Sequence, residues 1–149
     1  MSFQFPLEPL LRFRNSQEDL QRQRLIKLQQ ELVKNSQQIN VVTHSVLALK
    51  EKVRSDLKVG SRASQLHFAA DCRLQLETML LALKKQRTIL QERRDAQQRQ
   101  YLSARKEHQV IERLKEKACQ EYELQEARRQ QAATDELFLR RQRFKTGHK

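Results

Sequence analysis

Histidine and cysteine are the side chains in this sequence that could bind a metal ion. The four histidines, His44, His67, His108 and His148, are scattered along the chain. None belongs to the His-x-x-x-His or Cys-x-x-Cys spacing that brings metal ligands together. His108 falls on an apolar stripe, where an imidazole packs or forms a capping hydrogen bond more often than it ligates a metal. No metal site is therefore predicted.

Nucleotide chemistry and acid–base catalysis lack the residues they need. A phosphate-binding loop requires several glycines, whereas this chain has only Gly60 and Gly147. Charged residues make up 32% of the chain, but a solvated helix surface offers no pocket that could tune their pKa values. We expect no enzymatic activity, no cofactor and no small-molecule substrate.

The two cysteines, Cys72 and Cys119, fall on one predicted helix. Because an α-helix rises about 1.5 Å per residue, they would lie roughly 70 Å apart along it. A disulfide requires a Cα separation of about 4.4 to 6.8 Å, so both are predicted to be reduced thiols. Cys72 is expected to pack as a small apolar residue and Cys119 to lie beside the packed stripe.

The scarcity of helix-breaking residues predicts the elements that carry these side chains. The two prolines are Pro6 and Pro9, and Gly60 is the one glycine away from the chain ends. Residues 10–59 and 61–146 can therefore each form an unbroken helix. We predict an all-α fold: a single-domain (1–149) antiparallel two-helix coiled-coil hairpin whose C-terminal helix is the longer one. The first helix would span about 7–58, the turn about 59–63 and the second helix about 64–142, followed by a basic C-terminal tail.

The first helix carries a regular apolar stripe with steps of three and four residues. Its positions are Leu25, Leu28, Leu32, Asn35, Ile39, Val42, Val46, Leu49 and Val53. This 3.5-residue repeat is typical of a coiled-coil seam. Asn35 is the polar exception. It either fixes the register or the number of partner helices, at a cost in stability, or lies where the partner helix leaves it hydrated.

The second helix carries a less regular stripe. It begins with Ala69, Cys72, Leu76, Met79, Leu83, Gln86 and Leu90, and continues through the polar Arg93 and Gln97. After a step of four plus four residues it resumes at Tyr101, Ala104, His108, Ile111, Ala118 and Tyr122. Such a step is a stutter, which locally unwinds a supercoil.

Two apolar surfaces remain without a partner in this hairpin. With a turn at Gly60, facing residues have numbers that sum to about 120, so the helix after Ile111 would extend past the first helix for roughly 30 residues, about 45 Å. Apolar side chains on that stretch suggest that another molecule covers it. Leu74 and Leu81 lie two residues off the predicted stripe. They form either a docking stripe or part of a slightly rotated seam.

The net charge of +12 permits contact with acidic surfaces, nucleic acid or anionic lipid. The excess is spread along the chain, at +4 over residues 1–60, +2 over 61–92 and +6 over 93–149. The densest basic run, 140–145, is either a phosphate-contacting tail or a solvated cationic helix end. Nonspecific nucleic-acid binding is the alternative function from a different class. The even spread of charge along the chain and the lack of an aromatic stacking platform count against it.

A membrane-spanning helix is not predicted, because the longest apolar run, 79–83, is far shorter than the roughly 20 residues that a span requires. Residues 1–6 lack a basic region, an apolar segment and a cleavage site, so no secretory signal is predicted. A cytoplasmic location is expected.

Both ends of the chain resemble the FliJ family of bacterial flagellar export proteins. The N-terminal stretch 3–14, FQFPLEPLLRFR, followed by Glu18, is similar to the family's Phe-x-Leu-x-x-Leu-Leu-x-x-Arg opening. The stretch 112–117, ERLKEK, then Glu121-Tyr122, 129–131 and 135–137, resembles its Leu-Lys closing helix with a Gln-x-x-x-Asp-Glu signature. Ala127 and Gln130 depart from this pattern. The two matches cover about a third of the chain.

The resemblance implies a non-enzymatic component of the flagellar type III export apparatus, folded like the stalk of rotary ATPases. It implies contact with the export ATPase hexamer, with the cytoplasmic domain of the export gate protein and with export chaperones. The protein would be cytoplasmic and peripherally associated with the inner membrane at the flagellar base, with membrane contact only through partners. The equivalent stalk of a virulence injectisome is the alternative within this class.

Site residues follow from combining the resemblance with the two uncovered surfaces. The expected ATPase-binding residues are Leu7, Leu10, Leu11, Arg14, Tyr122, Gln131, Asp135, Glu136 and Phe138. The expected gate-binding residues lie on the turn-proximal half of the second helix: Leu74, Met79, Leu81, Ala82 and Gln86.

Overall fold

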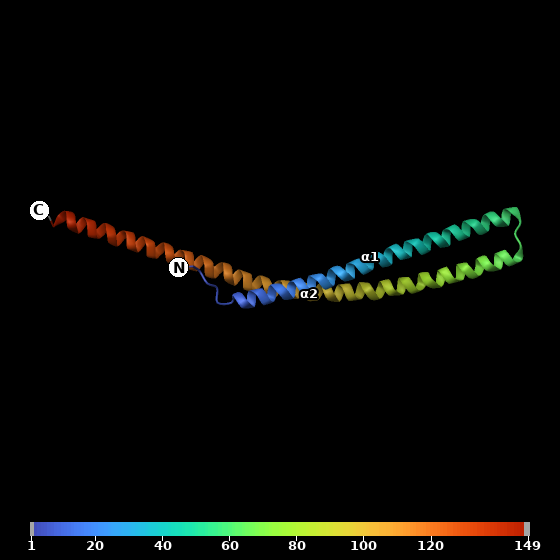
Figure 1. Ribbon diagram of the computed structural model, residues 1–149, viewed down its shortest axis with the longest axis horizontal. Coiled ribbons are helices and arrows are strands. Elements are labelled where there is room, and N and C mark those ends of the chain that lie inside the picture. Colours follow the sequence, from blue (N-terminus) through green and yellow to red (C-terminus); the bar gives the residue numbers. More distant parts are fainter. Residues whose placement is uncertain (1, 148–149) are drawn as a thin grey trace. The chain divides into compact units, whose positions relative to one another are not determined.

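The computed structural model describes residues 2–147 as two long helices, α1 (Glu8–Val59) and α2 (Ala63–Thr146). His148 lies outside this range. The helices contribute to two compact units. The turn unit comprises residues 19–102, and the terminal unit comprises residues 2–18 and 103–147. In each unit a segment of α1 packs antiparallel against a segment of α2, which confirms the predicted two-helix hairpin fold (Figure 1).

The helix boundaries follow from the few residues that restrict or free the backbone. Pro9 lies in the first turn of α1, where a missing backbone N–H costs nothing. Gly60 follows the end of α1 with a φ of +92°, a left-handed conformation that glycine adopts readily. Its N–H donates to the carbonyl of Asp56 at 3.0 Å, which satisfies one of the last carbonyls of the helix.

The core of the turn unit is the apolar stripe of α1 packed against α2. All nine predicted positions from Leu25 to Val53 are buried or half-buried, so this part of the prediction is confirmed. The most buried apolar side chains are Ile39, Val42, Val46 and Leu90, each between 5% and 8% exposed. The helix pair is therefore held by a narrow seam.

The predicted stripe of α2 is wrong at two positions near the turn. Met79 is 52% exposed and Gln86 is also exposed, whereas Leu80 is half-buried. The packed positions run Cys72, Leu76, Leu80, so the four-plus-four step lies here. A helix with 3.6 residues per turn drifts against a 3.5-residue repeat, and such a step compensates for the drift.

The predicted stutter around Gln97 is also wrong. Arg94 is half-buried and Arg93 is exposed, so the packed positions continue from Leu90 in regular steps of four and three. A long arginine side chain can cover apolar surface with its stem while its head group remains hydrated. The guanidinium of Arg94 binds Asp95 at 3.0 Å, in agreement with this placement.

Asn35 is buried in the seam, with 3% of its surface exposed. Its side-chain amide donates to the backbone carbonyl of Leu83 on the other helix at 3.2 Å. The residues of α2 that follow, Gln86 and Arg87, both point out of the seam. Of the two alternatives for Asn35, the structure therefore shows the buried, register-fixing one.

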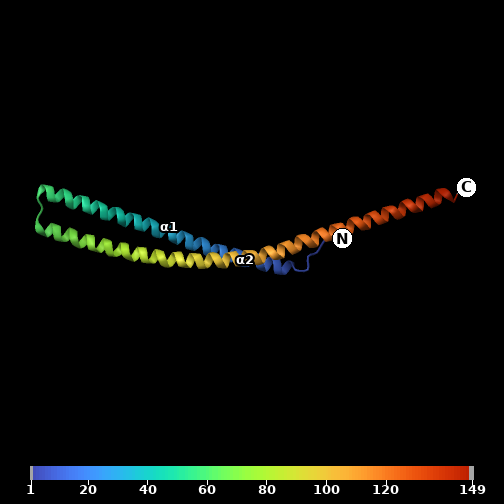
Figure 2. The same ribbon diagram turned by 180° about the vertical axis from the view of Figure 1, so that it is seen from behind.

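The terminal unit pairs the start of the chain with the middle of α2. Glu8 binds Lys115 at 2.9 Å, and the ring of Phe3 lies 5.5 Å from that of Tyr122. The N-terminal segment therefore covers α2 as far as Tyr122, so the expectation that cover ends at Ile111 is wrong. The extended residues before α1 account for the difference, because they continue along α2 where the first helix has not yet begun (Figure 2).

Beyond Glu126, every described residue of α2 is exposed, and no other segment of the unit lies beside this part in either view. Its helical state rests on local interactions. No glycine or proline occurs between residues 61 and 146. Two ion pairs join successive turns, Arg129 with Glu126 at 2.9 Å and Arg140 with Glu136 at 2.7 Å.

Candidate functional site

The expected ATPase-binding residues all lie in the terminal unit, where those of α1 are partly used for packing. Leu10 and Leu11 are half-buried, whereas Leu7 is 39% exposed. The guanidinium of Arg14 forms an ion pair with the carboxylate of Glu107 on α2. This part of the expected surface therefore also holds the N-terminal segment in place.

The remaining expected ATPase-binding residues lie on α2. Tyr122 is half-buried against Phe3. Gln131, Asp135, Glu136 and Phe138 are exposed, with Phe138 at 60%. They follow Tyr122 by about 14 to 24 Å along the helix at 1.5 Å per residue. The expected ATPase-binding residues therefore form two groups. One lies where the N-terminal segment covers α2, and the other lies on the uncovered end of α2.

A buried carboxylate–imidazole contact in the terminal unit was not predicted from the sequence. The Nδ1 atom of His108 lies 2.6 Å from Oε2 of Glu18, and the two side chains are 17% and 8% exposed. His108 was expected on the stripe, and the structure gives its imidazole a carboxylate partner. The register sum of about 120 places residue 18 opposite residue 102 (120 − 18), six residues before His108, so that relation did not indicate the pairing.

The five expected gate-binding residues lie on α2 in the turn unit and are all exposed. Leu74 and Leu81 are 64% and 70% exposed. With about 100° of rotation per residue, these two leucines lie nearly opposite the packed stripe. Met79 and Gln86 lie at its flank, roughly 130° from the leucines. The five residues therefore occupy two faces of the helix.

Each of these two faces adjoins a groove between the helices of the turn unit. Leu74 borders a groove of about 500 Å³ that also contains Leu57 and Ala70. Met79 borders a groove of about 470 Å³ that also contains Val41 and Leu83. Both grooves combine apolar and polar side chains in their lining and open to solvent, which suits them to contact with a protein side chain or helix.

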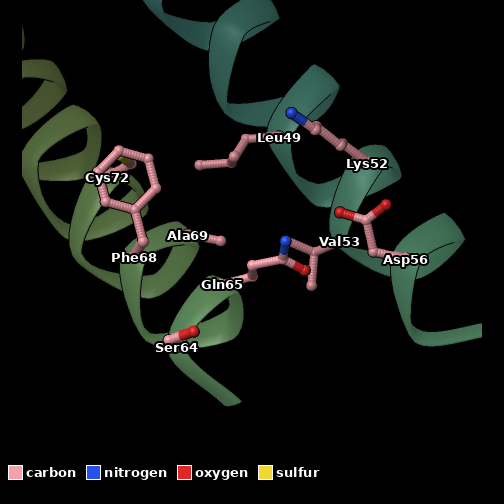
Figure 3. A pocket seen from close by; sticks show the side chains of 9 residues that line it. All are labelled: Leu49, Lys52, Val53, Asp56, Ser64, Gln65, Phe68, Ala69 and Cys72. Carbon is pink, nitrogen blue, oxygen red and sulfur yellow. The ribbon is translucent and has the colours of Figure 1, made fainter. Parts of the chain in front are cut away.

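A third groove, of about 480 Å³, lies next to the turn. Leu49 and Val53 of α1 face Phe68, Ala69 and Cys72 of α2 across it (Figure 3). The small side chains of Ala69 and Cys72 leave this space between the helices, while Phe68 is 72% exposed. The cysteine is a free thiol, as is Cys119.

The described residues present exposed surfaces and grooves that open to solvent. Over residues 2–147, no cluster of three or more His, Cys, Asp or Glu side chains could hold a metal ion. Neither α1 nor α2, as far as it is described, contains a stretch apolar enough to cross a membrane.

Comparison with known proteins gives one match. The family described as "Flagellar FliJ protein" matches residues 3–146, which is nearly the whole chain. The searches of curated proteins and of solved structures found no match. The matched range includes both the covered and the uncovered parts of the terminal unit, together with the entire turn unit.

Proposed function

Since this chain belongs to the FliJ family of flagellar proteins, we propose that it links the hexameric export ATPase to the cytoplasmic domain of the export gate and handles empty export chaperones. Membership in the family makes it a flagellar export-related, structural component. It also favours the flagellar system over an injectisome. We place the protein in the cytoplasm at the inner membrane of the flagellar base, held there by its partners.

The observation that supports the ATPase contact is the uncovered end of α2. Leu137, Phe138, Leu139 and Phe144 are between 57% and 82% exposed on a helix with no intrachain cover. Isolated helices with exposed large apolar groups gain stability when a partner covers them. A single helix about 10 to 12 Å in diameter is narrow enough to enter the axial opening of a ring.

Truncation tests the ATPase contact. Removing residues 130–149 deletes the exposed group but none of the seam of the turn unit, so residues 25–90 should remain helical by circular dichroism. We expect the truncated protein to lose its stimulation of the purified export ATPase. A control carries Arg128→Ala and Ala127→Ser, which change the preceding turn and retain the whole end. Full stimulation by the truncated chain would contradict a ring contact at this end and move the proposed contact to the turn.

The gate contact is proposed for the turn unit, on one of the two exposed faces of α2. Apolar side chains of Leu74 and Leu81 on one face, or Met79 beside its groove on the other, would supply the contact energy. A few large exposed side chains commonly dominate such interfaces. Handling of chaperones is proposed from the family alone, with no residue assigned to it.

A further inference from the structure

The two units are held together internally by different kinds of contact. In the turn unit, four apolar side chains are buried in the seam. In the terminal unit, the one residue of its described part that is buried to a comparable degree is Glu18, a charged residue with 6% of its surface exposed. The apolar side chains of Leu10, Leu11 and Ile111 are only half-buried.

Two ion pairs and one carboxylate–imidazole contact connect the N-terminal segment, residues 2–18, to α2. Glu8 binds Lys115 at 2.9 Å, Arg14 binds Glu107, and Glu18 binds His108 at 2.6 Å. In the turn unit, by contrast, the ion pairs Arg22–Asp19, Arg73–Glu77 and Arg94–Asp95 each join residues of the same helix. The helices of the turn unit are therefore joined by apolar packing and by a few hydrogen bonds of uncharged amides, whereas the terminal unit adds ion pairs between its two segments.

We propose that residues 2–18 form an electrostatic strap, which detaches from residues 104–122 of α2 while the seam of the turn unit stays intact. Detachment extends the uncovered surface of α2 from residue 123 back to Ala104, and it exposes Ile111 and Tyr122. The strap is thus a conformational device that regulates how much of α2 a partner can reach. This proposal does not depend on the identity of that partner.

Salt acts differently on the three pairs. The side chains of Glu8, Lys115, Arg14 and Glu107 are 34% to 51% exposed, so dissolved ions screen these two pairs. The Glu18–His108 pair is 8% and 17% exposed and is screened much less. Added salt should therefore weaken the strap, and loss of the Glu18–His108 contact should release it, because the remaining polar group would be left half-buried without this partner.

Hydrogen exchange measured by mass spectrometry on the full chain tests the strap. We compare the amides of residues 12–18 with those of residues 39–46, which lie in the apolar seam. Raising NaCl from 0.05 M to 0.5 M should accelerate exchange of residues 12–18 about threefold to tenfold, the range that two partly exposed ion pairs provide. Exchange of residues 39–46 should stay constant. Ordinary fraying of a helix end would not show this salt response at residues 14–18.

Two sets of variants separate the strap from a general loss of stability. Glu18→Ala removes the partner of the His108 imidazole and should accelerate exchange of residues 12–18 by at least about fivefold, while Glu31→Ala, an exposed acidic position on the same helix, should leave both segments unchanged. Glu8→Lys should also accelerate exchange of the strap, and the added change Lys115→Glu should restore the original rate. The restored charge pair would exclude a merely steric role.

Two results would overturn the proposal. Equal salt responses of residues 12–18 and 39–46 would show that both units open together. Failure of Lys115→Glu to restore the rate of Glu8→Lys would show that the charges do not hold the segment.

Discussion

Asn35 on α1 donates its side-chain amide to the backbone carbonyl of Leu83 on α2, at 3.2 Å, from within the apolar seam. The same carbonyl is also an acceptor of the helical ladder, so one side chain fixes the position of one helix against the backbone of the other. The second polar atom, Oδ1, is buried and has no protein partner. The register is thus specified at a cost in stability.

Replacing Asn35 with Leu removes this cost. Because the residue is 3% exposed between Leu32 and Ile39, Asn35→Leu should raise the stability of the hairpin by about 1 to 2 kcal/mol and the melting temperature with it. Thermal unfolding followed by circular dichroism measures the change. We also expect a second species in size-exclusion chromatography, since the register is less strictly fixed. Asn40→Leu, at an exposed position, is the control, and a lower melting temperature for Asn35→Leu would refute the interpretation.

Leu90 and Ile89 provide a second test of the seam. Leu90 is 5% exposed, and its neighbour Ile89 is 44% exposed. Leu90→Ala should reduce the free energy of unfolding by about 2 to 4 kcal/mol, because it leaves a cavity at the seam. Ile89→Ala should cost below about 1 kcal/mol. Urea denaturation of the two variants gives the comparison, and equal losses would contradict the assigned stripe.

Much of the fold was predictable because the sequence of α1 is compatible with few structures other than a helix in a coiled coil. Its stripe from Leu25 to Val53 is regular, polar residues surround it, and one glycine marks the turn, so the pattern and the burial agree. Met79 and Arg93 show where this reasoning failed. Met79 and Leu80 are both apolar, so hydrophobicity did not indicate which of them packs. The position of the four-plus-four step decides this.

The candidate site was less predictable, because it depends on contacts between distant residues. Phe3 precedes α1 and carries no helical pattern, so its packing on Tyr122 could not be inferred from periodicity. The pairing of Glu18 with His108 required the exact register of two helices. The exposed gate-binding residues were predicted individually, yet the rotation per residue separates them into two faces.

Phe3 and Tyr122 allow the cover of α2 to be measured directly. In a Tyr101→Phe background, Tyr122 is the single tyrosine of the chain. Phe3→Ala should increase quenching of its fluorescence by acrylamide, because the ring that lies 5.5 Å away is lost. Phe144→Ala, on the uncovered end, is the control. Unchanged quenching in Phe3→Ala would show that Tyr122 is not covered by this ring in solution.

The two exposed faces of α2 can be distinguished by binding to the cytoplasmic domain of the export gate. We expect Leu74→Glu with Leu81→Glu to weaken binding at least about tenfold, because two large apolar contacts are replaced by hydrated charges. Met79→Glu with Gln86→Glu should have little effect if the leucine face is the contact. Isothermal titration measures both, and helicity serves as the folding control. The reverse order of effects would assign the contact to the face with Met79.

Gly60 is free of neighbours: a Cβ added there would meet nothing within 4 Å, and the one demand on the residue is its positive φ. At this position the backbone conformation is therefore constrained, whereas the space around the residue would accept a larger side chain. Any substitution of the glycine is strained by this φ, and asparagine, which visits left-handed backbone more often than most residues, would be the least strained replacement. Because loops of this kind accept added length at low entropic cost, a tag or a fluorescent domain could be inserted at the tip without disturbing either helix.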